Sequence, residues 1–447
     1  MVKEKSSFIG KILRGTLVLF GTLLLAFIGF WVWGMPGPDL RGQWRTQGYG
    51  IVADIGWFTV DLREITPVSC ERYQLAPANL WLLKTLGGIE FDMDGGDLVI
   101  REASTVNPIG TTWLEAMPAV CTDSAERAPD DPEWNFEVFW NAFADHYPFF
   151  DLYDVDWDAR YAEFRPQVSA ATTQDELFEI FRGSVHGLED GHVFFVDHEN
   201  RRGHSPETGV PWGDQLDDAR AVAMGYLSDT VIGVNATGLS YGWLEGGIGY
   251  IRLAHMGADV GFGSTGAASA RGAIETAAGA LADAKGIIVD IRFNGGGDDS
   301  ISLAYAGGFT DQPVQAFTKV TQTLAGFTEP FKALTQPNGT VFLGQPAILL
   351  TSGYSASAAE IFTMAMREFP QVTVVGQATA GAHSDILTRN LPNGWEIGFS
   401  HQIYRTPDGT VYEGPGLPPD QEREFDSEGF TMGRDTLLEE AMAMLGR

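Results

Sequence analysis

The sequence predicts a layered α/β core, preceded by a helical region and a small β-rich domain. Two observations carry the prediction for the core. Four mostly apolar runs, as expected of strands buried on both faces of a sheet, occupy residues 247–256, 286–293, 346–352 and 372–376. Helical segments at 267–284 and 357–367 lie between these runs. Strands alternating with helices indicate a layered α/β arrangement, which we assign to residues 247–430.

The region before the core, residues 132–200, has a helical period. Aromatic side chains recur at three- and four-residue steps, which places them on one face of a helix, at Phe136, Phe139, Trp140, Phe143 and Tyr147. We interpret this stripe as core rather than as a ligand site. A second helix is expected over 157–164. A third is expected from Thr173 to about His186, because T-x-x-E is a capping-box pattern.

Residues 36–125 predict a small β domain, because short apolar runs with aromatic and β-branched residues are separated by Gly and Asp turns. A linker follows at 126–131, residues 201–246 are expected to be a connecting segment, and 431–447 a C-terminal helix. Cys70 and Cys121 are the two cysteines of the chain. In an exported domain they are expected to form a disulfide; two reduced, buried thiols are the alternative.

The N-terminus predicts a membrane anchor over residues 1–35. Residues 17–33 carry no charge, and extended back to residue 15 they are just long enough to cross about 30 Å of hydrocarbon. Basic residues precede them, so the body of the chain is expected outside the cytoplasm, in the periplasm of a bacterial-type cell. A cleaved signal peptide or a buried soluble helix are the alternatives. No cysteine follows the run, which excludes a lipoprotein.

Composition and motifs exclude several function classes. The 447 residues carry a formal net charge of −30, whereas nucleic-acid binding needs a basic footprint. No H-E-x-x-H, C-x-x-C or D-x-D-x-D-G spacing is present, so no metal and no cofactor are expected. His186, His198 and His204 lie near His192 but lack metal-ligand spacing.

Ser357 is the candidate nucleophile from the residues alone. It stands where a predicted strand turns into a predicted helix, in TSGYSASAAEIF. Such a turn exposes the side chain, and the free N–H groups and partial positive charge of the helix terminus favour a developing oxyanion. A serine that merely caps the helix is the competing interpretation.

Four segments in order resemble the C-terminal-processing, or tail-specific, serine protease family. They are GLEDGHVFF, VDIRFNGGG, SASAAEI and the stretch from NLPNGWEIG to EGPGLPPD, spread over about residues 133–425. The first and last are similar to the tricorn-core branch. The resemblance implies a ClpP/crotonase-like core, Ser357 as nucleophile, and an oxyanion hole made by the N–H groups of Ala358 and Gly296. A tight turn is the alternative for the glycines.

The resemblance leaves the general base to be assigned. Many members use a lysine where this chain has Ala382, so a serine–lysine dyad is excluded. The tricorn-core branch uses the histidine that corresponds to His192, assisted by a glutamate that corresponds to Glu413. That branch can carry a hydroxyl residue before the histidine, whereas this chain has Gly191, so how Glu413 connects to His192 is open. His383, beside the vacant lysine position, is the rival base.

The resemblance implies a serine endopeptidase that acts on exposed or unfolded polypeptides, and the N-terminal apolar run adds the membrane anchor. The partners are then a peptide substrate and, through residues 15–33, the lipid bilayer. Two other functions stay open on the same fold, namely a non-catalytic binder of apolar ligands and an envelope scaffold. Residues 200–246 are too few for the PDZ domain that many members carry, so substrate selection is absent or falls to the β domain.

Overall fold

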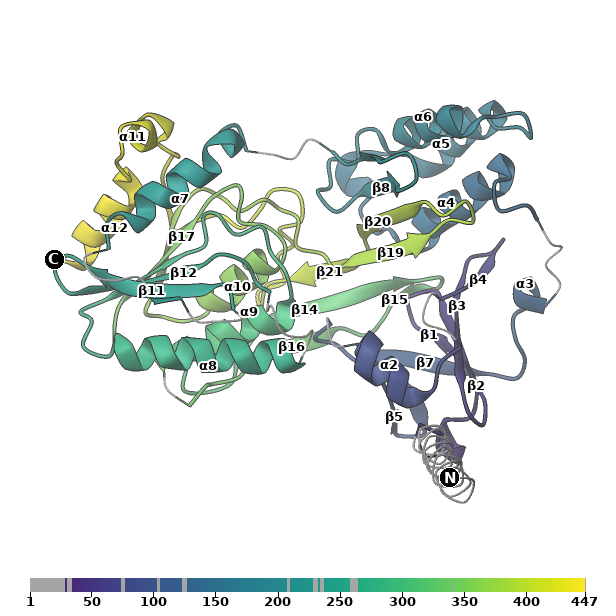
Figure 1. The fold of residues 1–447 in the computed structure, drawn as a ribbon, viewed down its shortest axis with the longest axis horizontal. Coiled ribbons are helices and arrows are strands. Elements are labelled where there is room, and N and C mark those ends of the chain that lie inside the picture. Colours follow the sequence, from purple (N-terminus) through teal and green to yellow (C-terminus); the bar gives the residue numbers. More distant parts are fainter. Residues whose placement is uncertain are drawn as a thin grey trace, which may run out of the picture.

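The structure is a computed structural model. It describes residue 29 and residues 34–446 except 74–76, 103–104, 123–126, 207–209, 228–231, 234–236, 258–263 and 340. The α/β core, the helical region and the β domain appear as three lobes, joined by long strands that run between them (Figure 1).

The N-terminal β domain is one antiparallel seven-stranded sheet, in the order β4-β3-β2-β1-β7-β6-β5. Its strands are β1 Gly42–Thr46, β2 Ile51–Ile55, β3 Val60–Ile65, β4 Cys70–Arg72, β5 Ile89–Asp94, β6 Asp97–Glu102 and β7 Ile109–Leu114. Two short helices, α2 Leu80–Gly87 and α3 Ala119–Thr122, accompany the sheet. Cys70 on β4 and Cys121 on α3 are joined by a disulfide, with their Cα atoms 5.0 Å apart.

The helical region contains α4 Pro132–His146, α5 Trp157–Phe164 and α6 Gln174–Val185. The predicted aromatic stripe is buried, and Phe139 stacks on Phe181 with ring centroids 4.0 Å apart. The predicted capping box is present, because Thr173 N–H donates to Glu176 and Glu176 N–H donates to Thr173 Oγ1.

A small four-stranded sheet belongs to this helical region, although two of its strands come from residues 386–400, which the sequence prediction assigned to the core. Its order is β19-β20-β8-β9, where β8 is Phe194–Asp197, β9 Arg202–His204, β19 Ile386–Asn390 and β20 Glu396–Ser400. Its apolar face shares one hydrophobic cluster with α4 and α6, in which Phe399 lies 4.5 Å from Phe143 between ring centroids. The helical region is therefore built from two distant parts of the chain.

The α/β core is a seven-stranded sheet in the order β10-β11-β12-β13-β17-β18-β22, parallel from β12 onward. Its strands are β10 Ile232–Gly233, β11 Leu239–Leu244, β12 Ile248–Leu253, β13 Ile287–Asp290, β17 Ala347–Thr351, β18 Val372–Gly376 and β22 Gln421–Glu422. The core thus begins before residue 247: β10 and β11, with α7 Leu216–Met224, belong to what was expected to be a connecting segment.

Helices cover both faces of this sheet, which explains the continuous apolar runs. Ile287 and Val289 pack with α8 Ser264–Ala280, α9 Asp299–Ala306 and α10 Ala358–Arg367, whereas Ile288 packs with α12 Thr436–Leu445. Successive side chains of a strand point to opposite faces, so both must be apolar when both faces are buried. α11 Ser427–Thr431 precedes α12.

A long strand, β14 Val314–Thr323, connects the core to the other lobes (Figure 1). It pairs with β15 Gly326–Phe327, β16 Phe331–Thr335 and β21 Gln402–Arg405. The β domain contacts this sheet, since Gln402 donates to Tyr49 Oη at 2.7 Å.

The predicted membrane anchor falls almost wholly on residues outside the described set. Among the helices that are described, none is both long enough and apolar enough to cross a bilayer.

A buried ion-pair network joins the C-terminal helix to the sheet. Arg292, 1% exposed, donates to both carboxylate oxygens of Asp290 and to both of Asp435, at 2.6–3.0 Å. Asp435 also caps α12 by accepting from Leu438 N–H. Because two carboxylates share one guanidinium, every member depends on the others for charge compensation.

We therefore expect Arg292→Met to lower the free energy of unfolding by about 3–5 kcal/mol, because it leaves two buried carboxylates without a cation. Urea unfolding followed by circular dichroism measures the change. Arg423→Met is the matched control, since its ion pair with Glu440 is solvent-exposed and contributes little to stability. Equal losses in the two variants would contradict a central role for Arg292.

Candidate active site

Ser357 lies between β17 and α10 and has a strained backbone. Its φ of 54° and ψ of −126° lie in a region that non-glycine residues seldom adopt, and such conformations cost about 1–3 kcal/mol. The conformation is held from both sides, because Ser357 N–H donates to Ala382 O at 2.9 Å and to Glu360 Oε2 at 3.1 Å. The side chain is only partly buried, so a substrate can reach it.

Gly296 lies against the nucleophile, as the predicted oxyanion hole requires. A Cβ added to Gly296 would lie 2.5 Å from Ser357 Cβ and 3.1 Å from Ala358 N, so only glycine fits there. Its N–H, however, donates to Asn294 Oδ1 at 2.9 Å. In this structure the N–H group of Gly296 is used within the loop, and the residue allows the loop to approach Ser357 closely. The oxyanion role of Gly296 stays a prediction.

Ala358, the other predicted oxyanion donor, is the first residue of α10. Its N–H has no acceptor among the described residues, as expected for a first-turn amide that points out of the helix. The helix dipole adds a partial positive charge at this point. The arrangement can stabilise an oxyanion that forms beside Ser357.

Glu360 is a site residue to which the sequence interpretation gave no role, although it is the Glu of the SASAAE motif. The side chain is fully buried and, besides Ser357 N–H, it accepts from Thr379 Oγ1, Gly381 N and Ala382 N at 2.6–2.9 Å. Burial alone would raise the pKa of Glu360, but His383 and these hydrogen bonds hold it below its usual value. Glu360 is therefore a buried carboxylate anion.

His383, the rival base, is buried between two carboxylates. Its Nδ1 lies 3.7 Å from Glu360 Oε1 and its Nε2 lies 3.4 Å from Glu413 Oε2. Burial lowers the pKa of His383, but Glu413 and Glu360 outweigh burial and raise it to about 9. At neutral pH this imidazole already carries its second proton, so it cannot accept one from Ser357.

His192 has the opposite environment. Burial lowers its pKa below the ordinary value, although Asp190 and Glu360 act against this change, so the ring is neutral near pH 7. One ring nitrogen of His192 and one carboxylate oxygen each of Asp190 and Glu413 lie within 4.8 Å of one another. No hydrogen bond between the His192 ring and Ser357 is present among the described residues, and catalytic contacts of this kind often tighten only when substrate binds.

Glu413 thus contacts both histidines of the site. Its Oε2 accepts from the backbone N–H groups of His383 and Ser384, at 3.4 and 3.1 Å, while its Oε1 is buried without a hydrogen-bond partner in the described part of the chain. Burial raises the pKa of Glu413 to about 8, even though His383 lowers it. The structure therefore brings Glu413 to His192, as the sequence predicted, but ties it more closely to His383.

Comparison with protein families agrees with this geometry. Residues 247–423 match the model of Peptidase family S41, and residues 128–183 match the Tricorn protease C1 domain. The first match contains Gly296, Ser357 and Glu413, and both follow the order expected from the sequence motifs.

Residues 247–423 therefore form a Peptidase family S41 domain.

The individual relatives match only part of this chain, and the chain spans less than a third of the length of the first two. A CtpA-like serine protease of Staphylococcus haemolyticus is 31% identical over 138 residues, which is 30% of this chain and 27% of the relative. A carboxy-terminal-processing protease of Bartonella bacilliformis is 29% identical over 30% of each chain. The crystal structure of a predicted peptidase from Parabacteroides merdae ATCC 43184 has a TM-score of 0.60 at 27% identity, covering 72% of this chain and 97% of that one.

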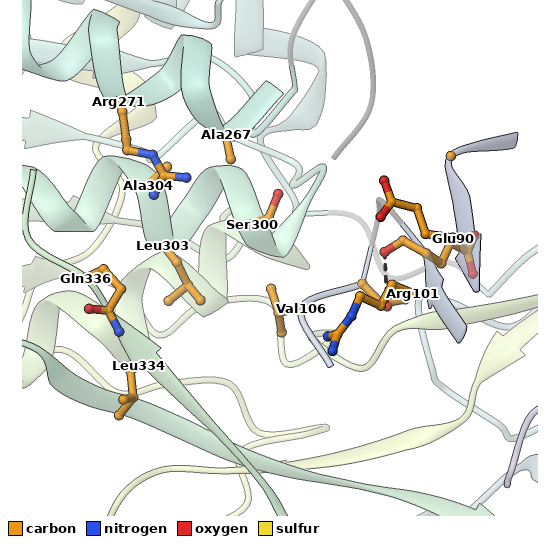
Figure 2. Close-up of a pocket in the computed structure, with 13 residues that line it drawn as sticks. Glu90, Arg101, Val106, Ala267, Arg271, Ser300, Leu303, Ala304, Leu334 and Gln336 are labelled. Carbon is orange, nitrogen blue, oxygen red and sulfur yellow. Dashed lines mark hydrogen bonds between the residues drawn. The ribbon is translucent and has the colours of Figure 1, made fainter. Parts of the chain in front are cut away.

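A cavity of about 390 Å³ lies where the β domain meets the S41 core (Figure 2). Leu303 on α9 and Val106 contribute to its apolar lining, and Arg271 on α8 and Arg101 on β6 lie on opposite sides of it. Ser300 also lines the cavity. It lies four positions after Gly296 in the sequence, so the Cα atoms of the two residues are within about 15 Å of each other. The cavity is therefore close to the site along the chain.

The strain at Ser357 predicts a trade between stability and activity. We expect the free energy of unfolding of Ser357→Gly to exceed that of Ser357→Ala by about 1 kcal/mol, because glycine adopts positive φ without strain. Thermal and urea unfolding of the two inactive variants give the difference. Ala356→Gly is the matched control, since its φ is not positive and the change there should destabilise. A Ser357→Gly variant less stable than Ser357→Ala would contradict the strain.

Proposed function

We propose that this protein is a serine endopeptidase in which Ser357 is the nucleophile and His192 is the general base. The observation that carries the proposal is the contrast between the two histidines. Both ring nitrogens of His383 face carboxylates, at 3.7 and 3.4 Å, which raise its pKa to about 9, whereas burial lowers the pKa of His192. A neutral imidazole with a pKa near or below 7 is the form that general-base catalysis requires.

The chemistry follows the usual course for a serine nucleophile. His192 takes the proton of Ser357 Oγ as this oxygen attacks the scissile carbonyl, and the oxyanion of the tetrahedral intermediate accepts from Ala358 N–H. His192 then gives its proton to the leaving amine. Water hydrolyses the acyl-enzyme by the reverse sequence of proton transfers, which regenerates Ser357. A second oxyanion donor is available if Gly296 N–H leaves Asn294 for the substrate.

His383 has a different role in this proposal. It compensates the charges of Glu360 and Glu413, which otherwise would be buried carboxylates without a cation. His383 thus places a positive charge next to Ala382, and Glu360 and Glu413 hold this charge in place. His383 supports the geometry of the site and does not transfer the proton of Ser357.

The substrates proposed are exposed or unfolded polypeptides, cleaved near their carboxy-terminal ends. The names of the relatives, which process carboxy-termini, support this substrate class. The cavity between the β domain and α9 supports a contribution of the β domain to substrate selection, because its apolar lining suits a side chain and Arg271 suits a carboxylate.

The proposed location is the outer face of a bacterial-type inner membrane, with residues 15–33 as a single-pass anchor. The support is the sequence pattern alone, that is, an uncharged run with a basic flank. A disulfide in the β domain is consistent with an oxidising compartment.

We expect Ser357→Ala and His192→Ala each to lower peptide hydrolysis by on the order of 10³-fold or more. His383→Ala should instead lower stability, because it leaves Glu360 and Glu413 unpaired. Rates of fluorophosphonate labelling and peptide turnover, normalised to the folded fraction from circular dichroism, separate these effects. A folded His383→Ala variant without activity, beside an active His192→Ala variant, would reverse the assignment of the base.

The pH dependence is a second expectation. Because the pKa of His192 lies below 6.5 and the neutral ring is the active form, kcat/KM should fall as the pH drops through a value below 6.5. His383, with a pKa of about 9, would give an acid limb near pH 9 if it were the base. A pH profile of kcat/KM between pH 4.5 and 10 decides between the two.

The topology is tested with a reporter fused to the C-terminus. A reporter enzyme that is active only outside the cytoplasm should be active when it is fused to the C-terminus. Protease added to spheroplasts should degrade the body of the chain. A C-terminus that stays inside the cytoplasm would refute the proposed location. Deleting residues 1–33 should release the body from the membrane fraction.

A further inference from the structure

Asp190 lies in the turn before β8 and is anchored from two directions. Its Oδ1 accepts from the backbone N–H of His192 at 2.9 Å and from Ser400 Oγ, at the end of β20, at 3.1 Å. The residue is 1% exposed. The carboxylate therefore has a fixed position directly beside the chain segment that carries the His192 ring.

The second oxygen of this carboxylate has no hydrogen bond of normal geometry within the described part of the chain, although the Tyr147 hydroxyl, which is also buried without such a bond, interacts with Asp190. Asp190 Oδ2 and His192 Nδ1 are both buried, and neither has a hydrogen-bond partner among the described residues. A ring nitrogen of His192 and a carboxylate oxygen of Asp190 belong to the group of atoms that lie within 4.8 Å of one another. Buried polar atoms are nearly always hydrogen-bonded, so an N–H at Nδ1 and an acceptor at Oδ2 are natural partners.

Glu413 is less suited to this task. Its Oε2 accepts from the amides of His383 and Ser384 and lies 3.4 Å from His383 Nε2, so its negative charge already faces another cation. The residue before His192 is Gly191, which has no hydroxyl to connect Glu413 to the ring.

The other charged groups around His192 do not replace Asp190. Glu360, Asp385 and His383 affect the pKa of His192, but each is engaged elsewhere: Glu360 with the loop around Ala382, Asp385 with Lys319 at 2.7 Å, and His383 with the two glutamates. Asp190 opposes the effect of burial on His192 more than any of them.

We infer that Asp190 is the positioning residue of this site, which accepts a hydrogen bond from His192 Nδ1–H and so leaves Nε2 free to take the proton of Ser357. This inference rests on the proposed function, because it needs His192 as the base. Fixing the tautomer and stabilising the imidazolium are what the third member of a serine–histidine–acid triad does.

The test is Asp190→Asn in the full chain, compared with Asp190→Glu and Glu413→Gln. We expect Asp190→Asn to lower kcat by about 10²–10⁴-fold with KM within twofold, since only the proton transfer is affected. The acid limb of the pH profile should move to lower pH, because the lost negative charge no longer favours the protonated ring. Asp190→Glu should restore part of kcat, and Glu413→Gln should lower it less than Asp190→Asn.

A merely structural role is separated by two measurements. Ser400→Ala removes the other hydrogen bond of Asp190 but keeps its charge, so it should leave the acid limb in place. Should Asp190→Asn fail to fold, ¹⁵N chemical shifts of His192 in the Ser357→Ala protein report the tautomer directly, and Nδ1 should carry the proton. An Nε2–H tautomer overturns the inference.

The outcomes also separate this inference from the proposed function. If His192→Ala keeps its activity, the proposed base is wrong and the role of Asp190 falls with it. If His192→Ala is inactive while Asp190→Asn keeps the wild-type kcat and acid limb, only the role of Asp190 is wrong.

Discussion

The site depends on one buried carboxylate, that of Glu360. It accepts from the backbone of Ser357 on one side and from Gly381 and Ala382 on the other, so it joins the start of α10 to the loop after β18. This bridge holds Ser357 in its strained conformation, and it also creates the need for a nearby cation. His383 meets that need, and its high pKa follows from the same two carboxylates. The positive charge of His383 therefore follows from the buried carboxylate that holds the backbone of Ser357.

This constraint explains why two histidines that lie close together differ so strongly. Both rings are buried, and burial alone lowers the pKa of each. Only His383 has its two nitrogens directed at carboxylates, at 3.7 and 3.4 Å, and only there does attraction exceed the cost of burial. His383 is thus a cation between two carboxylates, whereas His192 is neutral near pH 7. Two side chains of the same type thus differ in charge because their surroundings differ.

Much of this architecture was accessible from the sequence, because it is written in local patterns. The strands β12, β13, β17 and β18 are apolar on both faces, and α4 and α6 carry an aromatic stripe and a capping box. Long-range pairing is not encoded in this way, so the union of β19 and β20 with β8 could not be foreseen. Individual hydrogen bonds cannot be predicted from local patterns either, because they depend on distances in the folded chain. Examples are the bond from Gly296 N–H to Asn294 and the four donors that bind Glu360.

The order in which the chain is made has a consequence for when it can act. The site combines Asp190 and His192 with Glu413, which lies more than two hundred residues later, and the sheet beneath it is locked by Asp435 through Arg292. During translation, Ser357, the proposed nucleophile, emerges before Glu413 and Asp435 do. A nascent chain therefore lacks a compensated site until Asp435 has been added. The arrangement around Ser357 can form only after that point.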